Sequence, residues 1–246
     1  MEEQKTRIAA VGDIHVSQYD KGKWTDFFRK ASDQADMLLL CGDLTDTGDI
    51  KEAEVLASEM SACSIPVIAV LGNHDYEKEH ATEIRHLLEA ANKDVHVLDG
   101  ECVAIHGIGI AGVKGFGGGF DNYMLSMFGE PATKAFVQTA MDEAMRLERA
   151  LAHLDSMQTN LKKIVVMHYA PIKETVLGEP EVIHPFLGCS RLAEPLNTRG
   201  VLAAFHGHAH IGQLEGQTSA GVKVFNVSKQ ILARQGMEWP FFVYEV

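Results

Sequence analysis

The feature that most constrains the fold is a series of five short apolar runs, each followed within three residues by Asp, Asn or His. Apolar runs of this length are typical of strands that are buried on both faces of a sheet. In sheets of parallel strands, ligands bind outside the carboxyl ends of the strands, so the polar residues after the runs are expected to meet at one edge. The runs span Ile8–Val11, Met37–Leu40, Val67–Leu71, Ile164–Met167 and Val201–Phe205.

Amphipathic stretches separate the first three runs. They predict helices over Trp24–Ala35, Ile50–Ser61 and Ala81–Ala90. Strand and helix therefore alternate, and this order predicts a largely parallel sheet covered by helices and joined by right-handed crossovers. The expected fold class is α/β.

The second half of the chain is less regular. The longest helix is expected over Ala132–Ser156, where apolar residues form one stripe. A loop is expected over Tyr169–Pro185, and a shorter helix follows it near Cys189–Leu196. The remaining short strands are expected at Val95–Val97, Cys102–Ile105, Ile108–Ala111, Gln213–Glu215, Val222–Asn226 and Phe241–Glu245. No internal repeat or flexible linker is visible, which predicts a single domain over residues 1–246 with a helical insertion near 120–158.

Charge and cysteine content limit the partners and the compartment. Lys and Arg total 22 against 34 Asp and Glu, a net charge of −12. A broad basic surface for duplex nucleic acid is therefore not expected. No apolar run is long enough to cross a membrane, and the acidic N-terminus is unlike a signal peptide. The four cysteines are widely spaced, which fits a cytoplasmic protein without a disulfide framework. Homo-oligomerisation is left open.

The polar residues at the strand ends suit metal ions. Carboxylate, imidazole and carboxamide groups favour manganese, iron, zinc or magnesium, whereas softer metals favour thiolates. Two divalent ions joined by a bridging carboxylate would clamp a phosphate during in-line displacement. The candidate ligands, enough for two ions, are Asp13, His15, Asp43, Asn73, His168, His208 and His210.

The order of these motifs resembles the calcineurin-like metallophosphoesterase superfamily. The resemblance implies a four-layer α/β/β/α sandwich with a dinuclear metal site at the strand ends. It covers most of the chain, although the segment around 120–158 and the residues after His210 carry no motif of the family. The motifs are Gly12-Asp13-Ile14-His15, Gly42-Asp43, Gly72-Asn73-His74-Asp75, His168 and Gly207-His208-Ala209-His210.

The resemblance also implies a role for each of these residues. Asp13, His15 and His210 would hold the first metal. Asn73, His168 and His208 would hold the second, and Asp43 would bridge the two. A metal-bridging hydroxide would then attack the phosphorus.

The remaining motif residues would assist catalysis. The resemblance implies that His74 stabilises the transition-state oxygen or protonates the leaving alkoxide. Asp75 would orient His74. His206 precedes the last motif and either supports the ligands or has a purely structural role.

The motif variants narrow the resemblance within the superfamily. His15 is followed by Val16, and Asp43 is followed by Leu44-Thr45-Asp46-Thr47-Gly48. The phosphoprotein phosphatase branch shows Gly-Asp-x-His-Gly and Asp-Arg-Gly at these places. This sequence is more similar to the branch of cyclic-nucleotide phosphodiesterases and uncharacterised bacterial phosphohydrolases.

The predicted function is metal-dependent hydrolysis of a small phosphorylated substrate, with phosphodiesters favoured over monoesters and a cyclic nucleotide as one candidate. A phosphomonoesterase or pyrophosphatase with the same metals is an alternative. A scaffold that retains the fold without catalysis is another, and a nuclease acting on short oligonucleotides is less favoured. The residues that bind the rest of the substrate cannot be assigned from the sequence.

Overall fold

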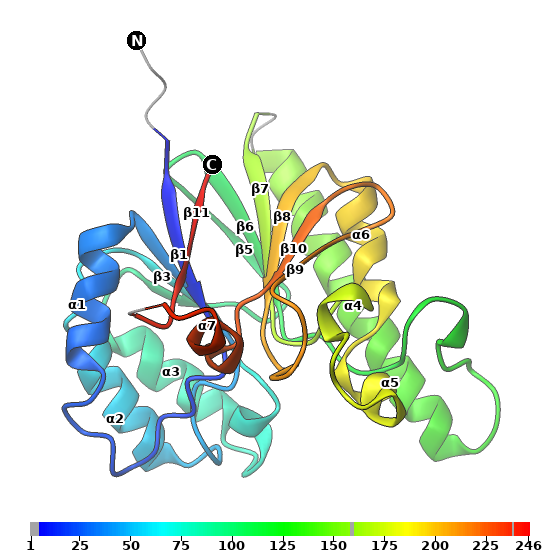
Figure 1. Ribbon diagram of the computed structural model, residues 1–246, viewed down its shortest axis with the longest axis horizontal. Helices are drawn as coiled ribbons and strands as arrows, with labels where there is room; N and C mark the ends of the chain where they lie inside the picture. Colours follow the sequence, from blue (N-terminus) through cyan, green and yellow to red (C-terminus); the bar gives the residue numbers. More distant parts are fainter. Residues whose placement is uncertain (1–4, 158–159, 238) are drawn as a thin grey trace.

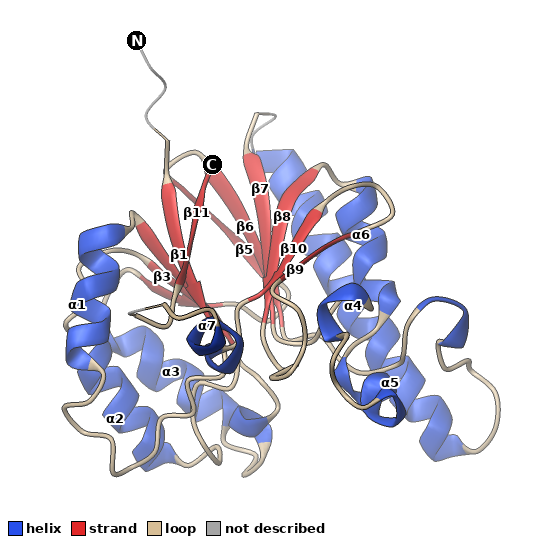
Figure 2. Cartoon of the chain, in the orientation of Figure 1, coloured by secondary structure: helices blue, strands red, loops and turns tan. Residues whose placement is uncertain are grey.

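The computed structural model describes residues 5–157, 160–237 and 239–246. Two sheets pack face to face, and helices cover the outer face of each (Figure 1). Coloured by element type, the layers run helix, strand, strand, helix across the molecule (Figure 2). The predicted α/β/β/α sandwich is therefore confirmed.

The first sheet has the strand order β11-β1-β2-β3-β4. Strands β1 to β4 are parallel, and β11 near the C-terminus pairs antiparallel with β1. Its strands are β1 (Arg7–Val11), β2 (Met37–Cys41), β3 (Val67–Val70), β4 (Val95–Val97) and β11 (Phe242–Glu245). Helices α1 (Thr25–Gln34), α2 (Ile50–Met60) and α3 (Ala81–Ala91) cover its outer face (Figure 1).

The second sheet has the order β5-β6-β7-β8-β10-β9. Its four inner strands are parallel, and the edge strands β5 and β9 are antiparallel to their neighbours. The strands are β5 (Glu101–Ile105), β6 (Ile108–Val113), β7 (Lys162–Met167), β8 (Val201–His206), β9 (Glu215–Gln217) and β10 (Lys223–Asn226). Helices α4 (Pro131–Met157) and α6 (Ala193–Thr198) form the outer layer.

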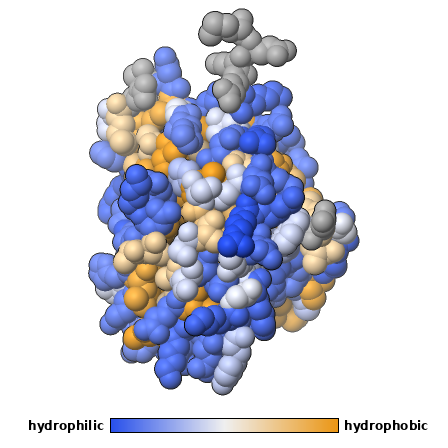
Figure 3. Space-filling model, turned by 90° about the vertical axis from the view of Figure 1, so that its left-hand side faces the viewer, coloured by the Kyte–Doolittle hydropathy of each residue, from blue (hydrophilic) through white to orange (hydrophobic). Residues whose placement is uncertain are grey.

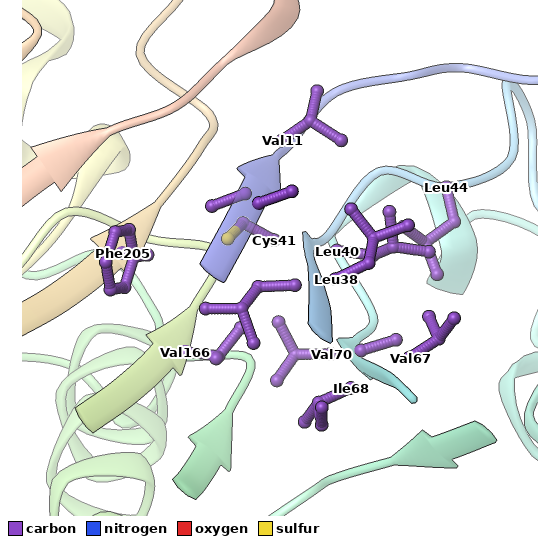
Figure 4. Packing of buried hydrophobic residues seen from close by; sticks show 14 of the residues in the cluster. Val11, Leu38, Leu40, Cys41, Leu44, Val67, Ile68, Val70, Val166 and Phe205 are labelled. Carbon is purple, nitrogen blue, oxygen red and sulfur yellow. The ribbon is translucent and has the colours of Figure 1, made fainter. Parts of the chain in front are cut away.

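The main core lies between the two sheets. Strand β2 is buried along its whole length, because both of its faces meet apolar side chains. Figure 4 shows side chains of both sheets in one cluster, with Val166 of β7 beside Val70 of β3. This packing fixes the two sheets relative to each other, so the loops at their strand ends are held on one common support.

The structure departs from the expected elements mainly after β7. The predicted loop over Tyr169–Pro185 contains short 3-10 turns at Glu174–Val176 and Glu181–Ile183, and α5 (His184–Leu187) begins within it. The predicted helix near Cys189–Leu196 is a 3-10 turn followed by α6. Strand β9 lies two residues later than expected. Helix α7 (Lys229–Arg234) was not predicted, because so short a helix gives little apolar periodicity.

The polarity of the surface and the state of the cysteines can be compared with the expectations from the sequence. The face that carries α1 and α2 is mostly hydrophilic, with smaller apolar patches between the polar side chains (Figure 3). Among the described residues, the helices lack the length and apolar character needed to span a bilayer. All four cysteines are free, as their spacing predicts.

Candidate metal centre

All seven predicted ligands lie just beyond the carboxyl ends of parallel strands. Strands of both sheets end at this edge of the sandwich. The ligands follow β1 (Asp13 and His15), β2 (Asp43), β3 (Asn73), β7 (His168) and β8 (His208 and His210). The edge therefore gathers residues that are far apart in the sequence, such as Asp13 and His210.

The ligands form two groups. In the first group, one ligand atom each from Asp13, His15 and His210 lies within 4.8 Å of the others. In the second group, Asp43, His168 and His208 meet the same limit. The Asn73 Oδ1 atom joins the second group, 2.9 Å from Nε2 of His168. These are the two sets that the family resemblance implies.

Asp43 lies between the two groups. Its Oδ1 is 3.3 Å from His168 Nε2 in the second group. Its Oδ2 is 3.8 Å from His15 Nε2 in the first. One carboxylate therefore presents an oxygen to each group, as a residue that bridges two cations must.

Hydrogen bonds to carbonyl oxygens fix the orientation of two histidines. Nδ1 of His168 is 3.0 Å from the Cys41 carbonyl, and Nε2 of His208 is 3.1 Å from the Phe186 carbonyl. A carbonyl can only accept, so these nitrogens carry the hydrogen. The opposite nitrogens, Nε2 of His168 and Nδ1 of His208, are left with lone pairs for a cation.

The chemistry of the donor set fits a divalent cation. Nε2 of His168 faces two acceptors, Asn73 Oδ1 and Asp43 Oδ1, an arrangement that needs a positive charge among the three atoms. Burial alone would lower the pKa of His168, but the nearby Asp43 carboxylate outweighs it and raises the pKa to about 9. The same charge on His168 lowers the pKa of Asp43 against the effect of its burial. A bound divalent cation would supply the charge that a proton supplies otherwise.

Four of the ligands have left-handed backbone conformations. The φ angles are 58° for Asp13, 46° for His15, 49° for Asp43 and 69° for His208. Such conformations cost about 1–3 kcal/mol each for residues other than glycine, and they concentrate at functional sites. The surrounding structure therefore holds these side chains in place at a cost in stability.

Two motif glycines leave room for the ligands. Gly42 has a φ of +82°, and a Cβ atom there would lie 2.4 Å from His168 Nδ1. A Cβ atom at Gly72 would lie 2.1 Å from Asp43 Oδ1. Real Cβ atoms do not approach other atoms this closely, so a side chain at either position would displace a ligand.

Replacing Gly72 with alanine is expected to weaken metal binding at least about tenfold, because the new methyl group displaces the Asp43 carboxylate. Titration of the metal-stripped protein with Mn²⁺ would measure this. Gly109→Ala is the matched control, because the atoms nearest to its Cβ would be the flexible ends of the Leu154 and Leu161 side chains. Equal Mn²⁺ affinities for Gly72→Ala and the control would contradict the steric argument.

His74 lies beside the metal ligands. Its Nδ1 is 2.6 Å from the Asp46 carbonyl, and its Nε2 is 3.9 Å from Asp43 Oδ2. The carbonyl fixes Nδ1 as the donor, so Nε2 is the atom that faces the site. This position suits contact with a phosphate bound at the two groups of ligands.

The orienting role predicted for Asp75 is corrected. Its buried carboxylate accepts hydrogen bonds from the backbone of Leu44 and Gly72 and from both the backbone and hydroxyl of Thr45. The His74 ring is oriented by the Asp46 carbonyl instead. Asp75 therefore ties the loop after β2 to the loop after β3, and so supports the ligands on these loops from behind.

His206 has a supporting position. Its ring is fully buried, with Nε2 2.8 Å from the Thr175 hydroxyl and Nδ1 2.8 Å from the Gly207 carbonyl. Burial lowers its pKa to about 4, so the ring is neutral. Asn226 donates to the carbonyls of Thr175 and Ala209. These bonds hold the loop after β8, with its two ligands, against the segment after β7.

Several residues that belong to none of the sequence motifs also lie near the metal ligands. The Tyr169 ring lies 4.4 Å from the His208 ring, measured between centroids. The Asp46 side chain has an oxygen 3.8 Å from His15 Nδ1, a buried atom without a hydrogen bond among the described residues. Lys114, at the end of β6, is close to Tyr169. The position of Lys114 after an apolar strand was a usable signal, whereas the Asp46 and Tyr169 contacts depend on the fold.

The two-sheet sandwich and the two groups of ligands at its edge are those of a metal-binding phosphoesterase. A family model described as calcineurin-like phosphoesterase matches residues 6–212. Because this match covers most of the chain, the protein belongs to the calcineurin-like phosphoesterase family.

Solved structures share the fold at low sequence identity. Phosphopantetheinyl hydrolase from Mycobacterium tuberculosis is 14% identical with a TM-score of 0.68, and the match covers 98% of this chain and 96% of that one. The protein TT1561 of Thermus thermophilus is 16% identical with a TM-score of 0.60, covering 98% and 99%. A putative 5'-nucleotidase from Staphylococcus aureus is 13% identical with a TM-score of 0.53, covering 91% of this chain and 48% of that one. No curated protein sequence matches the chain.

Proposed function

We propose that the protein hydrolyses phosphodiesters with two divalent metal ions held by Asp13, His15, Asp43, Asn73, His168, His208 and His210. The observation that carries the proposal is the position of Asp43, whose two carboxylate oxygens face the two groups of ligands. Membership of the calcineurin-like phosphoesterase family supports the reaction type.

Residues of the chain orient the metal ligands and face the phosphate in this reaction. When bound, the two cations would neutralise phosphate charge and activate the attacking water. The carbonyls of Cys41 and Phe186 keep His168 and His208 in the tautomers that bind a cation. His74 presents Nε2 toward the phosphate, where it can stabilise a phosphoryl oxygen or give a proton to the leaving oxygen.

The charge around His74 favours diesters. The Asp46 side chain is about half exposed beside the site, near His15. A phosphomonoester carries nearly two negative charges at neutral pH, whereas a diester carries one. A carboxylate at this place repels the monoester more strongly. The Asp-Arg-Gly pattern of the phosphoprotein phosphatases also has an acid here, but the arginine after it can pair with a doubly charged phosphate, whereas Thr47 takes that place in this chain.

Comparison of two chromogenic esters tests the proposal. The metal-stripped protein with added Mn²⁺ is expected to hydrolyse bis-p-nitrophenyl phosphate with a higher kcat/KM than p-nitrophenyl phosphate. Asp46→Asn is expected to raise the monoester rate relative to the diester rate a few-fold, because the charge is partly exposed and screened. The alternative of a phosphomonoesterase would be supported instead if the monoester is the better substrate.

A scaffold without catalysis predicts a different result. It would turn over neither ester with Mn²⁺, Fe²⁺, Zn²⁺ or Mg²⁺, although the metal could still bind. Measurement of bound metal in the same samples separates this outcome from simple failure to load the site.

A further inference from the structure

Two imidazole rings lie between two aspartates of the loop after β2. The rings are those of His15 and His74, and their centroids are 4.6 Å apart. Both rings present Nε2 to Asp43 Oδ2, at 3.8 Å for His15 and 3.9 Å for His74. Both Nδ1 atoms face Asp46, at 2.6 Å from its carbonyl for His74 and 3.8 Å from its Oδ1 for His15. Each ring therefore meets Asp43 with one nitrogen and Asp46 with the other.

This geometry decides which nitrogen of His15 can bind a cation. Nε2 faces Asp43 Oδ2, the oxygen that the bridging carboxylate presents to the first group of ligands. A neutral imidazole has one lone pair and one N–H, so a cation held by Nε2 leaves the hydrogen on Nδ1. In metal sites this second N–H almost always has an acceptor, which fixes the ring and makes the ligand nitrogen more basic.

The Nδ1 atom of His15 lacks such an acceptor in the structure. It is buried and makes no hydrogen bond among the described residues. Buried polar atoms are seldom left unpaired, so this one calls for a partner. Oδ1 of Asp46 lies 3.8 Å away, just beyond the usual length of a hydrogen bond.

The Asp46 side chain can close this distance. It is about half exposed, and within the described part of the chain its carboxylate is paired with His15 alone. A movement of about 1 Å would bring Oδ1 into the usual range for an N–H···O bond. A solvent-exposed carboxylate makes such a movement by rotation about its own side-chain bonds, without a change in the fold.

The backbones of the two loops are already joined beside this pair. The His15 amide donates to the Asp43 carbonyl at 3.0 Å. The Asp46 amide donates to the Val16 carbonyl at 3.1 Å, and the Val16 amide donates to the Leu44 carbonyl at 2.9 Å. The main chains of His15 and Asp46 are therefore fixed relative to each other, and a bond between their side chains costs only side-chain entropy.

We infer that Asp46 is a positioning residue for the first metal: its carboxylate accepts a hydrogen bond from Nδ1 of His15 and keeps Nε2 turned toward the cation. The inference rests on the metal centre of the proposed function and adds to it a residue that touches no ion. The backbone carbonyl of Asp46 orients His74 in the same way. The carboxylate keeps its charge in this bond, so its repulsion of a phosphomonoester is unchanged.

Titration of the metal-stripped protein with Mn²⁺ tests this inference. The wild type is expected to bind two ions. Asp46→Ala is expected to weaken the binding of one ion about 10- to 100-fold, the usual effect of losing such a partner of a ligand, and to leave the other unchanged. Asp46→Asn keeps an acceptor oxygen and is expected to restore most of the affinity. Asp33→Ala removes the same charge from an exposed position on α1 and is expected to bind as the wild type does.

Two results of this titration would overturn the inference. If Asp46 acts only through its backbone, Asp46→Ala binds Mn²⁺ as tightly as the wild type, because the bonds to Val16 and His74 remain. If its charge alone attracts the cation, Asp46→Asn and Asp46→Ala weaken binding equally. A wild type that binds no Mn²⁺ would instead refute the proposed metal centre, and the inference with it.

Nuclear magnetic resonance of the protein with excess Zn²⁺ gives a readout that does not depend on affinity. With ¹⁵N-labelled histidine, the Nδ1 proton of His15 is identified as the signal that His15→Asn removes. This proton is expected to exchange with water at least about tenfold faster in Asp46→Ala than in the wild type, as loss of a charge-assisted hydrogen bond implies. Equal exchange rates in the two proteins would show that Asp46 does not hold His15.

Discussion

The Asp43→Asn variant is expected to lose about a thousandfold in kcat, equivalent to about 4 kcal/mol of transition-state stabilisation. Asp43 presents one oxygen to His168 and the other to His15. An asparagine has one acceptor oxygen and no charge, so it cannot serve both groups of ligands. The side chain keeps its shape, and the backbone hydrogen bond from His74 to Oδ1 can still form.

Three measurements on Asp43→Asn separate loss of chemistry from loss of fold. The kcat with Mn²⁺ gives the catalytic effect, bound metal per chain shows whether one site or both are weakened, and the circular dichroism spectrum reports on the fold. Asp142→Asn is the matched control, because that carboxylate lies on α4, away from the metal centre, and accepts from Gln138. An Asp43→Asn protein with kcat within about tenfold of the wild type would show that the bridge is not required.

The metal ligands could be predicted from the sequence because each is fixed by local rules. A short apolar run predicts a buried strand, and the parallel order of strands predicts which ends lie together. Gly42 and Gly72 stand where only a missing side chain leaves room for the neighbouring ligand. Local pattern and overall fold therefore agree at these positions, and the structure brings the predicted set together.

The role of Asp75 could not be predicted in the same way. It follows His74 directly, which suggests contact between the two side chains. The 3-10 turn over His74–Tyr76 instead directs the carboxylate into the core, toward Leu44 and Thr45. The ring of His74 then bonds to a backbone carbonyl, and a carbonyl is present at every residue and so gives no sequence signal.

The contacts around Lys114 depend on tertiary structure in a similar manner. Tyr76, Phe116 and Tyr169 come from three different loops and meet at its ammonium group. Each aromatic residue alone has the pattern of an ordinary core side chain. Their arrangement follows from the way that β3, β6 and β7 lie beside each other across the two sheets, which the sequence does not specify.

Comparison of substrates with different leaving groups distinguishes the two possible roles of His74. A general acid matters when the leaving oxygen is a poor leaving group, and it matters little for p-nitrophenolate, which departs without a proton. If Nε2 of His74 protonates the leaving oxygen, His74→Asn is expected to reduce kcat about a thousandfold for an alkyl ester but only about tenfold for bis-p-nitrophenyl phosphate. If it stabilises a phosphoryl oxygen, both substrates lose a similar factor, of about a hundredfold.

Comparison of methyl p-nitrophenyl phosphate, bis-p-nitrophenyl phosphate and a dialkyl ester such as a cyclic nucleotide measures this difference. Bound metal is expected to stay at the wild-type level, because His74 holds no cation in the proposed arrangement. His153→Asn, on the outer helix α4, controls for loss of an imidazole elsewhere. Wild-type rates on all three esters would exclude His74 from the chemistry. Loss of metal would instead make it a ligand, in keeping with its position 3.9 Å from Asp43 Oδ2.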